Sequence, residues 1–218
     1  MTEVKICGVN SAEAFDAAVE AGADWVGFVF VPASPRAVAP ARAAALSGRV
    51  QGGPGRVGLF VEPSDEALQA ALDAVGLDAL QIYAAPDRAA AIGARFGVPV
   101  WLAVGVAGAA DLPSNAVTER LLLDAKAPPG AVLPGGNAHP FDWAMLRGWH
   151  APAPWLLAGG LTPANVAAAI RSSGAPGVDV SSGVERARGV KDPALIRAFT
   201  AAAKSTPSSE IAAMAPPR

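Results

Sequence analysis

The chain has 218 residues, 52% of them hydrophobic, and its 17 basic and 19 acidic side chains leave a formal net charge of −2. A chain of this length can bury ~70% of the surface of its unfolded state, so its core needs neither disulfides nor a structural metal. The balance of charge argues against a nucleic-acid-binding surface, and no apolar run approaches the ~20 residues of a membrane helix.

Short apolar runs rich in β-branched and aromatic residues recur along the chain, separated by Ala-rich stretches. Most of these runs are continuously apolar, which is typical of parallel strands covered by helices. We predict eight strands, at Val4–Val9, Trp25–Val31, Arg56–Val61, Ala79–Tyr83, Val100–Val104, Arg120–Ala125, Trp155–Ala158 and Gly177–Val180.

The Ala-rich stretches carry helix start and stop signals. Serine or proline stands at the start of each, and a glycine follows several of them. We predict helices at Ala12–Ala21, Ala41–Ser47, Asp65–Val75, Ala164–Arg171 and Ala194–Ala203, and only a short turn around Ala107–Asp111.

Eight strands with helical connections predict a single (β/α)8 barrel, the TIM barrel of the α/β class. The alternative is an open doubly wound sheet, but its nucleotide signature, GxGxxG after the first strand, is missing. We expect the barrel to span residues 1–204. Residues 205–218 contain three prolines and little periodicity, so we expect a disordered tail there. The Gly/Pro-rich segment 128–140 is too long for a tight turn, and such loops are often functional.

Cys7 is the one cysteine, so no intramolecular disulfide can form, as is typical of a reducing cytoplasm. Residues 1–10 lack the apolar core of a signal peptide. We therefore expect a cytoplasmic protein. The two histidines, His139 and His150, lack metal-ligand spacing, and no metal site is predicted.

In a barrel of this kind the active site lies at the carboxyl ends of the strands. The predicted strand ends and the loops after them bring Cys7, Arg36, Tyr83, Asp124 and Asp179 to that face. Strands one, six, seven and eight are neighbours there, because strand eight pairs with strand one when the barrel closes.

Two glycine-bearing turns follow strands seven and eight, where this fold often binds phosphate. One holds Gly159 and Gly160, and the other holds Ser181, Ser182 and Gly183. Glycine lets backbone N–H groups approach an anion closely. One such turn alone is most simply a tight turn, but two at these neighbouring strand ends favour a phosphate site.

Taken alone, the remaining candidates have simpler explanations. Cys7 can be a buried core thiol, Asp124 a carboxylate that caps a turn, and Arg36 a solvated loop residue. Alternatively, Lys5 lies on the same side of the strand as Cys7 and can favour a thiolate, while Lys126 can pair with Asp124. The planar guanidinium of Arg36 can bind a carboxylate.

Longer motifs stand in a fixed order from residue 4 to about residue 200. They are KICGV at 5–9, EAGADWVGFVFVPASPR at 20–36, VGLFVE at 57–62, LLLDAK at 121–126, PGGNAHPFDW at 134–143, LAGGLTPANV at 157–166 and GVDVSSGVERARGVKDP at 177–193. With these motifs the sequence resembles the phosphoribosylanthranilate isomerase family of tryptophan biosynthesis. Related phosphate-binding barrels share the AGGL-like turn but not the combination of KICG with VDVSSGVE.

The resemblance implies an Amadori rearrangement of N-(5-phosphoribosyl)anthranilate to 1-(2-carboxyphenylamino)-1-deoxyribulose 5-phosphate, without a cofactor. It implies Cys7 as general base, Asp124 as general acid, Arg36 as the partner of the anthranilate carboxylate and Asp179 as a contact for polar groups of the substrate. Asp124 must then be protonated, so burial must raise its pKa, and Cys7 must be ionised, so its pKa must fall below the free value. The implied phosphate ligands are Gly159, Gly160, Ser181, Ser182 and Gly183.

Two positions depart from the family pattern. The family commonly has QLHG at the end of the fourth strand, whereas this chain has QIYA at 81–84. We expect Tyr83 to bind substrate in place of that histidine. The loop after strand six often reads GGTG or GGSG and here reads GGNA at 135–138, where Ala138 tolerates positive φ less well than glycine.

Two other functions fit parts of the pattern. Lys126 follows an apolar strand and can form a Schiff base, as in barrel aldolases. A non-catalytic phosphosugar-binding barrel would explain Tyr83 and Ala138, but the retention of Cys7, Asp124 and Arg36 argues against it. For partners we predict a small phosphosugar, and neither nucleic acid nor membrane. We expect a monomer, with a homodimer through an exposed Trp149 as the alternative.

Overall fold

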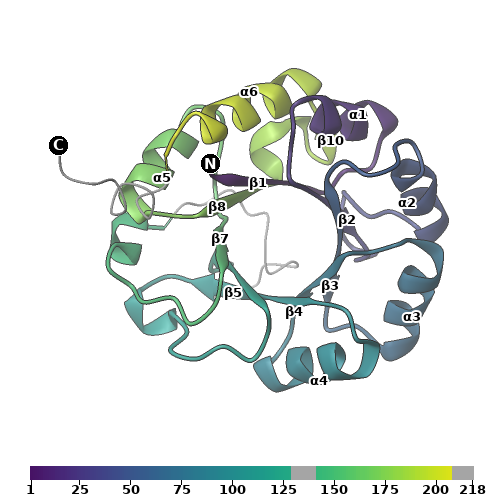
Figure 1. Ribbon diagram of the computed structural model, residues 1–218, viewed down its shortest axis with the longest axis horizontal. Helices are drawn as coiled ribbons and strands as arrows, with labels where there is room; N and C mark the ends of the chain where they lie inside the picture. Colours follow the sequence, from purple (N-terminus) through teal and green to yellow (C-terminus); the bar gives the residue numbers. More distant parts are fainter. Residues whose placement is uncertain (129–140, 208–218) are drawn as a thin grey trace.

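The computed structural model describes residues 1–128 and 141–207. Its eight parallel strands form a closed barrel in chain order, and helices surround it (Figure 1). The predicted (β/α)8 barrel is therefore confirmed, and the open sheet is excluded. The strands are β1 (Glu3–Cys7), β2 (Trp25–Val29), β3 (Gly55–Val61), β4 (Ala79–Tyr83), β5 (Val100–Val106), β6 (Arg120–Ala125), β7 (Trp155–Leu157) and β8 (Gly177–Val180).

The barrel closes between β1 and β8. Lys5 is paired with Asp179 and Ile6 with Val180 in this register. Because side chains alternate between the two faces of a strand, Lys5 and Asp179 both point into the barrel, while Ile6 and Val180 face the surrounding helices. The register of this one pair of strands thus brings residues from the two ends of the chain into the same interior layer.

Helix boundaries follow local capping chemistry. The side chain of Ser11 accepts a hydrogen bond from the Ala14 N–H, and that of Ser64 accepts one from the Ala67 N–H, as the sequence predicts. Proline occupies the first turn of three helices, where its missing N–H costs nothing. The helices are α1 (Ala12–Glu20), α2 (Pro40–Ser47), α3 (Asp65–Ala74), α4 (Pro86–Phe96), α5 (Val166–Ser173) and α6 (Pro193–Lys204).

Two helices differ from the prediction. Helix α4 was not predicted, although Pro86 begins it and Gly97, at φ 64°, ends it. Helix α5 begins at Val166, two residues later than expected. The Asn165 side chain explains the delay, because it accepts a hydrogen bond from the Thr162 N–H and donates one to the Gly160 carbonyl. These bonds keep the preceding residues in a turn.

The connections on either side of β6 contain short 3-10 turns in their described residues. Turn η1 (Ala109–Asp111) lies inside the predicted segment Ala107–Asp111, and η2 (Trp143–Leu146) precedes β7. Residues 129–140, which include Ala138 and His139, lie outside the described residues. In Figure 1, helices α1 to α4 follow one another along the outside of β1 to β5. In the described residues of the connections before and after β6, the helical segments are the short turns η1 and η2.

After β8 comes a small hairpin that the sequence analysis missed. Turn η3 (Ser182–Val184) leads into β9 (Glu185–Ala187) and β10 (Val190–Lys191). Gly189, at φ 81°, forms its tip, and a Cβ there would lie 2.5 Å from the Pro35 carbonyl oxygen. The hairpin therefore packs against the loop after β2.

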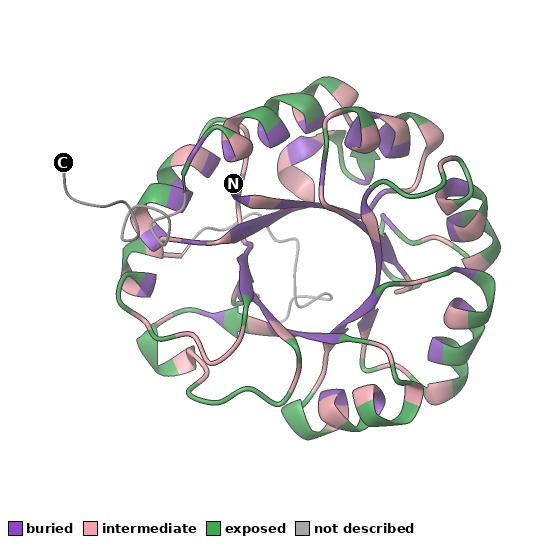
Figure 2. Cartoon of the chain, in the orientation of Figure 1, coloured by how far each residue is buried: buried purple, intermediate pink, exposed green. Residues whose placement is uncertain are grey.

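The core has two parts. Apolar residues between the barrel and its helices form the larger part, and the smaller one fills the barrel interior around Trp101, Leu122 and Leu156. Figure 2 shows the ring of strands as mostly buried and the outer helix faces as exposed. At the amino end of the strands, Arg120 lies over the rings of Trp25 and Trp101 and pairs with Glu3. This cluster fills the amino end of the barrel interior.

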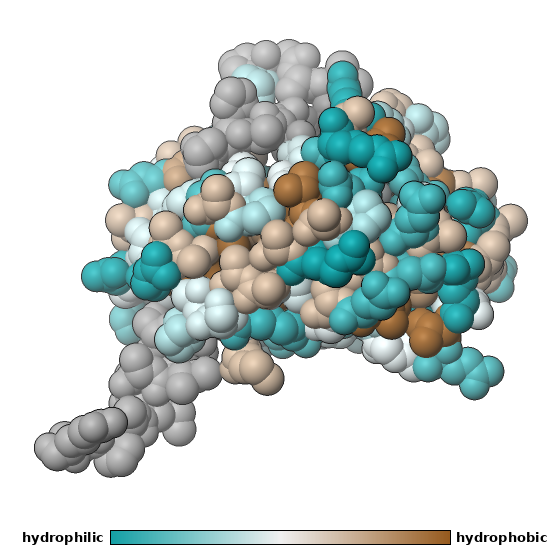
Figure 3. Space-filling view, turned by 90° about the horizontal axis from the view of Figure 1, so that it is seen from above, coloured by the Kyte–Doolittle hydropathy of each residue, from teal (hydrophilic) through white to brown (hydrophobic). Residues whose placement is uncertain are grey.

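The last described residues pack on the barrel. Thr206 is buried, its hydroxyl donates to the Ala202 carbonyl, and its own carbonyl accepts from the Thr2 hydroxyl at 2.8 Å. The rest of the predicted tail, 208–218, lies outside the described residues. On the face shown in Figure 3, apolar side chains form small patches between polar ones. Within the described part of the chain, no helix has the length and apolarity needed to cross a membrane.

Candidate active site

Four of the predicted site residues lie inside the carboxyl end of the barrel. Cys7 is the last residue of β1, Tyr83 the last of β4, Asp124 the fifth of the six residues of β6, and Asp179 the third of the four of β8. Cys7, Asp124 and Asp179 are each less than 10% exposed. Their strands come from all parts of the sequence, so barrel closure alone brings them together.

Lys5 forms the floor of this site. Its ammonium group donates to the Asp179 carboxylate and to the Gln81 side-chain oxygen, each at 2.8 Å, and the whole residue is buried. Burial lowers the pKa of Lys5, but Asp179 and Cys7 outweigh it, and the pKa is raised. Lys5 is therefore a permanent cation beneath the site.

Cys7 lies beside Lys5 and close to the backbone of β2. A Cβ on Gly27 would lie 3.1 Å from both the Cys7 sulfur and the Lys5 nitrogen, so glycine leaves space for both groups. Burial raises the pKa of Cys7, and Lys5 and Lys191 lower it only in part. The expectation that this pKa falls is wrong for the substrate-free protein, because removal from water disfavours the thiolate more than the lysines stabilise it.

Asp124 is held by neighbours on both carboxylate oxygens. The Tyr83 hydroxyl donates to Oδ2 at 3.0 Å, and the Ala125 N–H donates to Oδ1 at 2.8 Å. Lys126, the predicted partner of Asp124, instead pairs with Asp111 at 3.2 Å, and its side chain is 58% exposed. That exposure also removes the desolvation on which the Schiff-base alternative depends.

Tyr83 lies between the acidic groups of the site. Burial raises the pKa of its hydroxyl well above the ordinary value, and the negative charges of Asp124, Asp179 and Cys7 raise it further. The hydroxyl therefore stays protonated and donates to Asp124. Its hydroxyl contacts the candidate acid, and the predicted contact of Tyr83 with substrate stays a prediction.

Arg36 lies in the loop after β2, with its stem against Gly8. At Gly8, whose φ is 76°, a Cβ would lie 2.7 Å from the Arg36 Cδ atom. The Arg36 guanidinium forms a forked ion pair with Glu185, with Nε–Oε1 at 2.6 Å and Nη2–Oε2 at 3.0 Å. The predicted carboxylate-binding arginine thus already holds one carboxylate of the protein.

The two predicted phosphate turns touch each other. Gly159 and Gly160 have φ angles of 87° and 64°, which L side chains rarely adopt. A Cβ on Gly183 would overlap the Leu161 carbonyl oxygen, so the turn after β8 lies directly against the turn after β7. A Cβ on Gly159 would lie 3.2 Å from Asp124 Oδ1. The turns and the candidate acid therefore adjoin.

Sequence reasoning missed four residues of this site. Gln81 and Gly27 lie on predicted strands, and their inward-facing positions on those strands could have identified them. Glu185 and Lys191 lie on the unpredicted hairpin. A charged residue on each side of the tip RARG was the available signal, but the hairpin is too short for a periodic pattern.

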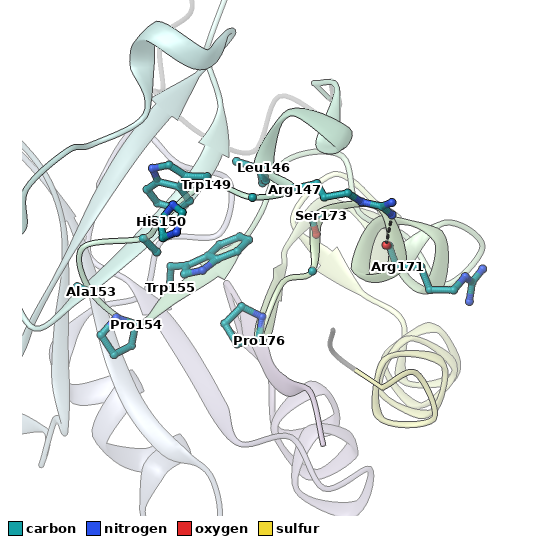
Figure 4. Close-up of a pocket in the computed structure, with 13 residues that line it drawn as sticks. Leu146, Arg147, Trp149, His150, Ala153, Pro154, Trp155, Arg171, Ser173 and Pro176 are labelled. Atoms are coloured by element: carbon teal, nitrogen blue, oxygen red, sulfur yellow. Dashed lines mark hydrogen bonds between the residues drawn. The ribbon is translucent and has the colours of Figure 1, made fainter. Parts of the chain in front are cut away.

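A separate pocket lies at the other end of the barrel (Figure 4). Trp149, Pro154, Trp155 and Pro176 line it, at or just before the first residues of β7 and β8. The Trp149 indole N–H donates to the Pro113 carbonyl, and its ring contacts Trp155 edge-on. Trp149 is half-buried rather than exposed, which removes the predicted basis for a dimer contact there. This pocket lacks the candidate acid and base.

Among residues 1–128 and 141–207, no group of three His, Cys, Asp or Glu side chains is arranged to hold a metal ion.

The profile of the N-(5'-phosphoribosyl)anthranilate (PRA) isomerase family matches residues 4–202. The chain belongs to this family. The family prediction from the motifs is thereby confirmed, and a non-catalytic barrel is not supported.

A relative from Acidiphilium cryptum, an N-(5'-phosphoribosyl)anthranilate isomerase, is 56% identical over 206 residues, 93% of this chain and 98% of the relative. A phosphoribosyl anthranilate isomerase crystallised with reduced 1-(o-carboxyphenylamino)-1-deoxyribulose 5-phosphate has a TM-score of 0.80 and 34% identity, covering 94% of this chain and all of that one. The family also includes a dimeric enzyme from Thermotoga maritima, whose generated monomers have a TM-score of 0.77 and 34% identity over 94% of this chain and 100% of theirs.

Proposed function

We propose that this chain, as the isomerase of tryptophan biosynthesis that its family indicates, uses Asp124 as general acid and Cys7 as general base. Its reaction is the Amadori rearrangement of N-(5-phosphoribosyl)anthranilate to 1-(2-carboxyphenylamino)-1-deoxyribulose 5-phosphate. One observation carries the assignment of roles. Asp124 and Cys7 are buried at the same end of the barrel, and the glycine turns suited to phosphate adjoin Asp124.

The two ends of the substrate fit two parts of this face. Backbone groups at Gly159, Gly160, Ser181, Ser182 and Gly183 bind the 5-phosphate. Arg36 binds the anthranilate carboxylate, so the ribose lies between, over Cys7 and Asp124. Asp179, fixed by Lys5, contacts polar groups of the ribose.

The chemistry needs only proton transfers. Asp124 donates a proton to the furanose oxygen, the bond from that oxygen to C1 breaks, and a protonated Schiff base forms between C1 and nitrogen. The Cys7 thiolate removes the C2 proton, and the electron pair moves toward nitrogen to give an enolamine. C1 then gains a proton from the Cys7 thiol while the C2 hydroxyl returns one to Asp124, which yields the ketone and restores both residues. Each transfer contributes ~10²–10⁴-fold, and no cofactor is needed.

The raised pKa of Cys7 fits this order of steps. In the substrate-free site the thiol form is favoured, because burial outweighs the lysines. The Schiff base formed on ring opening adds a positive charge beside the sulfur, and an adjacent cation stabilises a thiolate. We infer that the reactive enzyme is the fraction in which the Cys7 thiol has already lost its proton to water, and that the Schiff base then stabilises this thiolate.

The direct test follows the loss of fluorescence of freshly made phosphoribosylanthranilate. Cys7→Ala and Asp124→Asn should each lose ~10²-fold or more in kcat. Lys126→Ala serves as a control, because its exposed side chain pairs with Asp111 away from the proposed acid. An inactive parent contradicts the function, and full activity in either site variant contradicts that residue's role.

We also propose that residues 1–204 are the catalytic domain, that the protein is cytoplasmic, and that it is a monomer. The fold supports the first point, because the barrel is complete at α6. Light scattering during gel filtration tests the third, and a mass of two chains would favour a homodimer like the enzyme of Thermotoga maritima.

A further inference from the structure

Glu185 holds Arg36 along one edge. It accepts from Nε and from one N–H of Nη2, and the two side chains are only 5% and 9% exposed. A guanidinium has five N–H donors in a planar fork. The pair with Glu185 uses the side edge and leaves the end edge, formed by Nη1 and the second N–H of Nη2, for another carboxylate.

Glu185 is itself fixed from other directions. The Lys191 ammonium donates to Oε1 at 2.9 Å, and the Gly189 N–H donates to Oε2 at 3.0 Å. Lys191 also donates to the carbonyl and the hydroxyl of Ser181, so its three bonds use all three N–H groups of an ammonium. A continuous set of bonds therefore joins Arg36 to the proposed phosphate turn.

The charges of this group leave one unit unbalanced. Burial pushes the pKa of Glu185 upward, but Arg36, Lys191 and the Gly189 N–H hold it below its ordinary range. Glu185 is thus an anion at neutral pH, between two cations. Burial lowers the pKa of Lys191, and the charge of Glu185 opposes that lowering. With both basic side chains charged, the sum over Arg36, Lys191 and Glu185 is one positive charge, which matches one substrate carboxylate.

We propose that Glu185 is a positioning residue that gives this site its selectivity for an aryl carboxylate. It fixes the plane of Arg36 so that the end edge of the guanidinium faces the substrate, while Lys191 keeps the group cationic. This inference rests on the proposed function, in which Arg36 binds the anthranilate carboxylate. Glu185 acts through Arg36 and need not touch the substrate.

The experiment compares two probes, reduced 1-(o-carboxyphenylamino)-1-deoxyribulose 5-phosphate and the same compound without its carboxyl group. Calorimetry gives the ratio of their Kd values for the parent and for Glu185→Gln. We expect the parent to prefer the carboxylated probe, and Glu185→Gln to lower that preference ~10-fold or more, since forked charge-assisted bonds depend on geometry. Affinity for the probe without the carboxyl should change less than twofold.

The chain offers a matched control. Arg49 forms the same forked pair with Asp16, with Nε–Oδ1 at 2.8 Å, on the protein surface. Asp16→Asn removes a carboxylate from an arginine fork without reaching the site, so the ratio should stay at the parent value. In an Arg36→Ala background, Glu185→Gln should cause no further loss of preference.

Should Glu185→Gln fold poorly, Glu185→Asp replaces it, because aspartate keeps the charge but is one methylene too short for the same fork. A lowered preference in either variant, confined to the carboxylated probe, supports the inference. Equal weakening of both probes, or an unchanged ratio, overturns it. If the parent protein binds neither probe, the proposed function is contradicted. The ratio of the two Kd values tests only the role of Glu185.

Discussion

The hydroxyl of Tyr83 donates a hydrogen bond of 3.0 Å to Oδ2 of Asp124, from the end of β4 to the end of β6. The family commonly has histidine at the position of Tyr83, so this chain reaches its candidate acid with a different donor. Burial and the surrounding negative charges keep the tyrosine protonated. We predict that this bond orients the acid, and direct contact of Tyr83 with the substrate stays a prediction from the sequence.

Replacement of Tyr83 by phenylalanine should therefore lower kcat. Loss of a hydrogen bond costs ~0.5–1.5 kcal/mol, or up to about tenfold in rate if the bond orients the acid. KM should change less than twofold, because the substrate keeps its own contacts. Steady-state kinetics give both constants. Tyr83→His, which places the family's common histidine there, should keep most of the parent kcat. If Tyr83→Phe raises KM and leaves kcat unchanged, Tyr83 binds the substrate instead of orienting the acid.

The activity should rise with pH. The pKa of Cys7 is raised above its free value of about 8.5, so less thiolate is present at pH 7 than in a free cysteine. Because kcat/KM reports the free enzyme, it should increase through pH 7 to 9 and level off only above the Cys7 pKa. A flat profile over that range would exclude a buried thiol as the base.

Lys5→Met should move this rise to higher pH. Lys5 is the largest influence that lowers the pKa of Cys7, and its loss also leaves the Asp179 charge, which raises that pKa, unopposed. The pH dependence of kcat/KM measures the shift. Lys126→Met removes an exposed lysine and should leave the profile in place.

Lys5 should also matter for stability. Removing one partner of a buried ion pair costs ~3–5 kcal/mol, because the other charge is left unpaired in the interior. Lys5→Met should lose about that much free energy of unfolding, measured with urea, and Lys5→Met with Asp179→Asn should lose less. Arg49→Met breaks a pair whose side chains are 41% exposed and should cost under ~1 kcal/mol. Similar losses of unfolding free energy in Lys5→Met and Arg49→Met would contradict the argument that burial makes the Lys5 pair more costly to break.

Gly183→Ala should weaken phosphate binding. The new Cβ would overlap the Leu161 carbonyl oxygen, so the turn after β8 must move away from the turn after β7. We expect KM and the inhibition constant for inorganic phosphate both to rise ~10-fold, since anion-binding backbone groups depend on their arrangement. Gly76→Ala, where a Cβ meets nothing within 4 Å, is the control. An unchanged phosphate constant would exclude these turns as the phosphate site.

Much of the architecture could be predicted because its signals are local. Apolar runs such as Ala79–Tyr83 mark strands, and serine caps such as Ser11 and Ser64 mark helix starts, within a few residues of sequence. Helix α4 and the hairpin of β9 and β10 were missed. The hairpin strands have three and two residues, so no period can be read from them. Their packing against the Arg36 loop depends on tertiary contact alone.

The sequence by itself determined the barrel, the family and the eligibility of Cys7 and Asp124, because apolar runs of strand length and ordered motifs are properties of the chain. The tertiary structure decided the partner of each polar group. Lys5 bonds Gln81 from 76 residues away, and Arg36 bonds Glu185 from 149 residues away. Such pairs exist only once the barrel closes and the hairpin packs against the loop after β2. The same burial sets the Cys7 pKa above its free value, because the cost of a charge depends on surroundings that neighbouring residues in sequence do not supply.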